Sequence, residues 1–104
     1  MKYVISWRER PAASSSDYEA AHRRIMQLFN KEWKFPPSFT IHQFVVRAGD
    51  YGGYMVMETD KPTDIHYVTS VFAAFAFTVE PVVDVMDAVA EQLKAIDYLK
   101  TKTS

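Results

Sequence analysis

The hydrophobic periodicity of the chain switches between two residues and about 3.6 residues in a fixed order along its first half. Residues 2–8 alternate apolar and polar side chains, which predicts a strand. Residues 16–33 carry apolar side chains at helical spacing and predict a wide amphipathic helix. Residues 38–47 and 54–59 read as two further strands. The glycine-containing turn 48–53 between them predicts an antiparallel hairpin.

In the second half of the chain the hydrophobic periodicity again changes between that of a helix and that of a strand. Asp60-Lys61-Pro62 opens a helix, with Pro62 in its first turn. A strand follows at about 77–85, and Pro81 within it predicts an edge position or a bulge. A last helix is expected at about 87–100. The order βαββαβ predicts an α+β fold of the ferredoxin-like type, a four-stranded antiparallel sheet with two helices on one face and an extra C-terminal helix.

Composition limits the class of protein. The 104 residues fit one domain, 1–104, with a polar tail from about residue 100. A net charge of −1 argues against nucleic-acid binding, and the absence of cysteine excludes thiolate metal sites and a thiol nucleophile. The longest apolar run, 71–77, is far shorter than the ~20 residues that span a bilayer, and residues 1–8 do not read as a signal peptide. We therefore expect a cytoplasmic protein without a membrane partner.

Both parities of the predicted strands contain apolar residues. In the second strand, Phe39, Ile41 and Val45 share one parity, whereas Phe44 and Val46 share the other. A sheet with one wet face would alternate cleanly, so we expect both faces to be covered. The face without helices would span about 400 Å², a size that marks an interface. We expect a homodimer through this face. The alternative is a monomer whose C-terminal helix folds back over it.

Few side chains suggest chemistry. Mid-strand His42 is a candidate proton acceptor, or else a hydrogen-bonded residue of the dimer interface. Glu58 and Glu80 are carboxylates within apolar strands and candidates for acid–base chemistry, and His42 with Glu80 or Tyr54 would supply proton transfer. Either glutamate could equally face solvent or pair with an arginine. His22 is interpreted as a residue at a helix–sheet boundary.

Aromatic residues are 14% of the chain and suggest an apolar pocket between helices and sheet. The candidate ligand-binding residues are Trp7, His42, Tyr51 and Tyr54. Tyr51, in the glycine turn, would close over a pocket or touch a partner chain. No phosphate loop or nucleophile elbow is present, the three histidines show no zinc spacing, and no cofactor or metal is predicted.

Three segments resemble a known family. They are the N-terminal strand Tyr3–Trp7, the stretch Tyr54–Asp60 leading into Lys61-Pro62, and the strand Phe77–Val83. The pattern resembles small bacterial dimeric α+β-barrel proteins, and among them the family of domain of unknown function 3303. The resemblance implies a sheet-to-sheet homodimer but no settled activity. Proteins of the same fold include cofactor-independent monooxygenases, haem enzymes and muconolactone isomerase-like enzymes, and fold alone does not choose among them.

Three functions are therefore weighed. The first is an uncharacterised dimeric protein that binds a small apolar molecule between helices and sheet. The second is a cofactor-independent monooxygenase or isomerase-like enzyme that uses a histidine–carboxylate pair, His42 with Glu80 or with Tyr54 assisting. The third is a haem or metal protein that uses His42 or His66.

Overall fold

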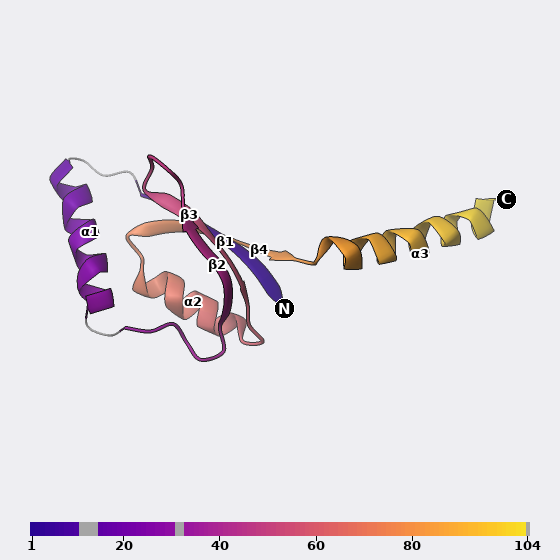
Figure 1. Ribbon diagram of the computed structural model, residues 1–104, viewed down its shortest axis with the longest axis horizontal. Helices are drawn as coiled ribbons and strands as arrows, with labels where there is room; N and C mark the ends of the chain where they lie inside the picture. The colour runs from indigo at the N-terminus through magenta and orange to yellow at the C-terminus, as the bar shows by residue number, and fades with distance from the viewer. Residues whose placement is uncertain (11–14, 31–32, 104) are drawn as a thin grey trace.

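The computed structural model describes residues 1–10, 15–30 and 33–103 (Figure 1). Its elements are β1 (Lys2–Glu9), α1 (Ser15–Asn30), β2 (Thr40–Val46), β3 (Gly52–Glu58), α2 (Pro62–Val71), β4 (Phe75–Val82) and α3 (Val85–Thr103). The order is the one that the sequence predicts, and the fold is α+β with a four-stranded antiparallel sheet.

The sheet has the strand order β2-β3-β1-β4, and each neighbouring pair is antiparallel. β4 lies at an edge, one of the two arrangements expected from Pro81, because proline has no N–H to donate to a neighbouring strand. A register shift between Ile41 and Gln43 marks an irregularity in β2. The hairpin turn contains Gly49 at φ 82°, a backbone conformation that glycine adopts without steric cost.

One face of the sheet, here called the inner face, holds the core. Tyr3, Ile5 and Trp7 of β1 stand opposite Met57, Met55 and Gly53 of β3. Figure 1 shows α1 and α2 on this side of the sheet. Met57 is fully buried and Ile5 is 4% exposed, so the burial of these apolar side chains provides the main stabilisation.

The opposite, outer face is mixed rather than uniformly apolar. Ser6 of β1 stands beside Tyr54 and Thr78, and Val4 stands beside Val56 and Glu80. Apolar side chains therefore lie on both faces, as the sequence predicts, and on the outer face polar ones stand among them. The last strand differs from prediction at its ends, because β4 runs over Phe75–Val82 rather than about 77–85.

The helices also differ from prediction at their ends. α1 ends at Asn30, so Trp33, which was expected on its apolar side, lies in the connection to β2. α2 ends at Val71 and Phe75 begins β4. Helix α3 continues to Thr103, so the described part of the predicted polar tail is helical.

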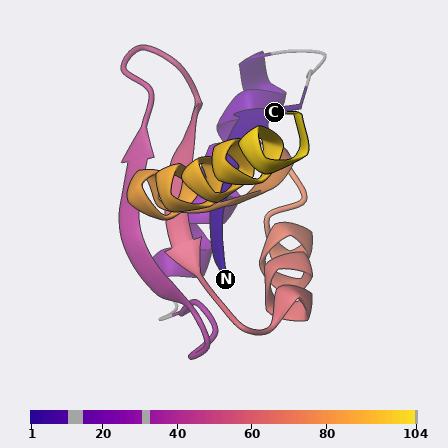
Figure 2. The same ribbon diagram turned by 90° about the vertical axis from the view of Figure 1, so that its right-hand side faces the viewer.

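α3 projects away from the sheet on the outer side (Figures 1 and 2). The radius of gyration is 18.8 Å, against about 13 Å expected for a compact domain of this length. The long extent of 65 Å has the same cause, because 19 helical residues add about 28 Å. The chain does not fold this helix back over its own sheet.

Candidate functional site

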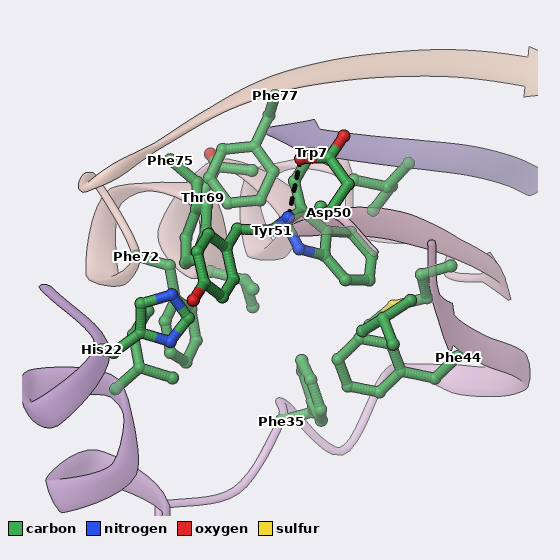
Figure 3. Close-up of a pocket in the computed structure, with 16 residues that line it drawn as sticks. Trp7, His22, Phe35, Phe44, Asp50, Tyr51, Thr69, Phe72, Phe75 and Phe77 are labelled. Carbon is green, nitrogen blue, oxygen red and sulfur yellow. Dashed lines mark hydrogen bonds between the residues drawn. The ribbon is translucent and has the colours of Figure 1, made fainter. Parts of the chain in front are cut away.

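A cavity of about 460 Å³ lies between the inner face of the sheet and the two helices (Figure 3). Every strand, both inner helices and several of the segments that connect them contribute to its wall. Its lining is Ile5, Trp7, His22, Ile25, Phe35, Phe44, Val46, Asp50, Tyr51, Gly52, Met55, Val68, Thr69, Phe72, Phe75 and Phe77.

The indole of Trp7 forms part of the cavity wall because its cross-strand neighbour has no side chain. Gly53 pairs with Trp7, and a Cβ at Gly53 would stand 2.7 Å from Trp7 Cζ2. The indole packs edge-on against Phe44 of β2, with ring centroids 5.2 Å apart. A glycine on β3 therefore lets one aromatic ring extend across the inner face to the next strand.

The connection after α1 supplies a second aromatic wall. Phe35 lies 5.8 Å from Phe44 and 5.0 Å from Trp33, measured between ring centroids. Trp33 in turn packs against Phe72 at 5.0 Å. Edge-to-face packing of this kind is a favourable arrangement for aromatic rings.

Polar groups gather at one end of the cavity. The Nε2 atom of His22 on α1 lies 3.0 Å from the Oε1 atom of Glu9 on β1. Tyr51 packs edge-on against the imidazole, 4.2 Å between ring centroids, and Figure 3 shows its hydroxyl end pointing toward His22. The carboxylate of Asp50 accepts a hydrogen bond of 2.7 Å from the Tyr51 backbone N–H.

The predicted ligand-binding residues divide between the two faces. Trp7 and Tyr51 line the cavity, as a pocket between helices and sheet requires. Tyr54 lies on the outer face, where the Arg47 guanidinium stands 5.7 Å from its ring centroid. His42 also lies away from the cavity, at the irregularity of β2.

The predicted catalytic residues do not meet as a group. His42 Nε2 lies 2.7 Å from Glu58 Oε2, and both side chains are nearly half exposed. Glu80 sits on β4 at the other edge of the sheet, three strand spacings or about 14 Å away. The histidine–carboxylate pair that the structure forms is therefore His42 with Glu58.

Sequence reasoning missed Glu9 and treated His22 as a boundary residue. His22 does lie at the boundary between α1 and β1, and it also lines the cavity. The position of Glu9 in β1 is the signal from which the pair of Glu9 and His22 could have been predicted. Glu9 follows Tyr3, Ile5 and Trp7 at the next inward position of β1, so a carboxylate directed at the helix layer calls for a partner there.

The clearest pKa shifts lie outside the cavity, where α3 begins. The hydrogen bond from the Lys2 ammonium lowers the pKa of the Asp84 carboxyl, and the same contact raises the pKa of Lys2. Both groups are exposed, so this pair is a surface contact beside the start of α3 and not a buried reactive site.

Two searches of the described residues bear on other classes of site. No three histidine, aspartate or glutamate side chains within the described ranges come close enough to hold a metal ion. None of the helices described combines the length and apolar character needed to cross a bilayer.

The fold and the cavity define a ferredoxin-like α+β protein with an aromatic chamber between its sheet and its helices. The sequence profile of domain of unknown function 3303 matches residues 1–96, and the chain belongs to this family. This confirms the resemblance seen in the sequence. No curated protein matches the chain.

Proposed function

We propose that the protein binds a small, largely aromatic molecule in the cavity between its sheet and its helices. The observation that carries the proposal is the cavity itself, about 460 Å³ with a lining dominated by aromatic and aliphatic side chains. Pockets for small molecules typically measure 300–1,000 Å³ and combine an apolar wall with a few polar groups. A chain of this size ordinarily packs its core to crystal-like density, so a space of this volume calls for an occupant.

The proposed assembly is a homodimer. The outer face of the sheet carries Val4, Val45, Tyr54 and Val56 among its polar residues, and Val45 is 47% exposed. The exposed apolar side chains of α3 lie on the same side of the molecule. A second copy packed against the outer face would cover both surfaces about a twofold axis. The bacterial, cytoplasmic setting expected from the sequence stays a prediction.

An enzyme is the second candidate, favoured by the His42–Glu58 contact of 2.7 Å. A carboxylate that holds one imidazole nitrogen orients the other as a proton acceptor. In the proposed dimer this pair would lie between the two sheets. A cofactor-independent monooxygenase or isomerase-like reaction would use His42 there, with Glu58 in the place that the sequence assigned to Glu80.

Binding can be tested by blocking the cavity. Thr69 on α2 lines it, whereas the adjacent Ser70 is exposed, so Thr69→Trp and Ser70→Trp are a matched pair. Naphthalene is a suitable apolar probe. At a hundredfold excess over its dissociation constant, a ligand stabilises the folded state by about 2.7 kcal/mol, which raises the Tm of a chain of this length by about 10–20 °C.

We expect this rise in the wild type and in Ser70→Trp, and its loss in Thr69→Trp. Thermal unfolding followed by circular dichroism gives the comparison. Equal shifts in the two variants would place the probe outside the cavity and overturn the proposal.

A further inference from the structure

We propose that the natural ligand is an aromatic molecule with a neutral hydroxyl head, a phenol or an enol, and that His22 and Glu9 bind this head. The inference rests on the proposed function and extends it from an apolar ligand to an amphipathic one. It depends on three features of the polar end of the cavity.

The first feature is a second cavity that adjoins the aromatic one. It has a volume of about 740 Å³ and is lined by Arg8, Glu9, Glu19, His22, Arg47, Asp50 and Tyr51. His22, Asp50 and Tyr51 line both spaces. A molecule in the aromatic cavity would therefore direct one end toward a compartment whose wall is almost entirely ionisable.

The second feature is a set of buried polar atoms without hydrogen bonds. Among the residues that the structure describes, these atoms are Glu9 Oε1, His22 Nε2 and Arg47 Nε, and all three residues line the second cavity. The Glu9 side chain is 11% exposed, so water does not freely solvate its carboxylate. His22 and Glu9 lie 3.0 Å apart but without the geometry of a hydrogen bond. Buried polar groups in this state are costly, and a ligand that completes their hydrogen bonds gains the difference.

The third feature is the balance of charge. Three residues with basic groups, Arg8, Arg47 and His22, face three with acidic groups in the same wall. An anionic head would meet the carboxylates, and a cationic head would meet the guanidinium groups. A hydroxyl avoids both, because its O–H donates to the Glu9 carboxylate while its oxygen accepts from His22.

Tyr51 is placed to cover the head group. It is 57% exposed, and its ring packs edge-on against the His22 imidazole (Figure 3). Its backbone carbonyl accepts a hydrogen bond of 3.3 Å from the Glu9 N–H, which ties the turn to β1, so rotation of the side chain alone would uncover the head group.

The test uses three probes that share one ring system: naphthalene, 2-naphthol and 2-naphthoate. Dissociation constants are measured by probe fluorescence with the full chain. We expect 2-naphthol to bind at least about tenfold more tightly than naphthalene, because hydrogen bonds to charged groups contribute that much. We expect 2-naphthoate to bind more weakly than 2-naphthol.

His22→Phe keeps a ring against Tyr51 but removes both nitrogens. Glu9→Gln is nearly isosteric and serves as the second variant, so the test holds even when His22→Phe does not fold. Either variant should erase the tenfold preference. Glu9 does not line the aromatic cavity, so Glu9→Gln should also leave naphthalene binding within about twofold. His66→Phe makes the same change at an exposed position of α2 and should keep the preference.

Equal binding of naphthalene and 2-naphthol would overturn this inference and leave the proposed function standing. Tightest binding of 2-naphthoate would show an anion site instead, and a preference that survives in both variants would exclude His22 and Glu9. Failure of all three probes to bind would overturn the proposed function and the inference together.

Discussion

Removing α3 tests the proposed dimer most directly. A chain that ends after Asp84 keeps the whole sheet and both inner helices. It lacks a helix whose apolar residues recur every three or four positions, namely Met86, Val89, Leu93 and Ile96. Met86 is 74% exposed and Leu93 is 56% exposed. Most of the stability of a helix in a protein comes from packing of its apolar face, so α3 needs a surface to pack on.

The size of the effect follows from these exposures. Full burial of such a side chain stabilises by about 1.5–3 kcal/mol, so covering the exposed half of each contributes roughly 1 kcal/mol. Met86, Leu93, Ile96 and Leu99 together give about 4 kcal/mol for each helix. Ordering costs offset part of this, and two helices act in a dimer. We therefore expect truncation to raise the dissociation constant at least about 10³-fold.

Light scattering and sedimentation at micromolar concentrations measure both states. The full chain should have twice the mass of one 12.0 kDa chain, and the truncated chain should be monomeric. A truncated chain that dimerises with an unchanged constant would refute the role given to α3. A full chain with a mass near 12.0 kDa would refute the dimer as a whole.

Three further changes have defined outcomes. Gly53→Ala would place a Cβ 2.7 Å from Trp7 Cζ2, so β2 and the indole must shift, and denaturant unfolding should show a loss of about 1–3 kcal/mol or more; unchanged stability would contradict the close packing at this pair. The pKa of Asp84 is lowered by Lys2, so its contribution to stability is complete above the ordinary value of 3.8 and is lost as the pH falls through the lowered value of the folded state. Asp84→Asn should remove this part of the acid dependence, and parallel pH profiles of the two proteins would argue against it. His42→Ala removes a contact between two partly exposed side chains and should cost less than about 1 kcal/mol in the monomer, so a loss of several kcal/mol on unfolding would show a structural role.

The fold was predictable because its determinants are local. Alternation in β1, the glycine turn and the proline at the start of α2 each specify one element, and their order leaves few topologies. Pro81 predicted an edge position or a bulge for the last strand, and β4 lies at an edge. Element ends were less accurate, as at α1 and β4, because the terminal residues of each element are decided by packing with others.

The outer face shows where pattern reasoning reached its limit. Parity separates the two faces correctly only while the strand stays regular, and the shift between Ile41 and Gln43 changes the parity of β2 partway along. His42 lies at that point, which brings it to Glu58 on the outer face. A bulge of this kind depends on pairing with a neighbouring strand, and a single-strand pattern does not contain that information.

The contacts around the cavity could likewise be predicted only in part from the sequence. Sequence reasoning could assign Trp7 to the inner face and Tyr51 to a turn, and both line the cavity. It could not pair His22 with Glu9, because their contact depends on the distance at which α1 stands from β1. The cavity depends in the same way on how rings from several elements pack together, Phe35 and Phe44 among them. A side chain that would be an ordinary boundary histidine in a fully packed core therefore becomes the polar end of an aromatic chamber. The role proposed for His22 depends on the cavity beside it, and a cavity produces no pattern in the sequence.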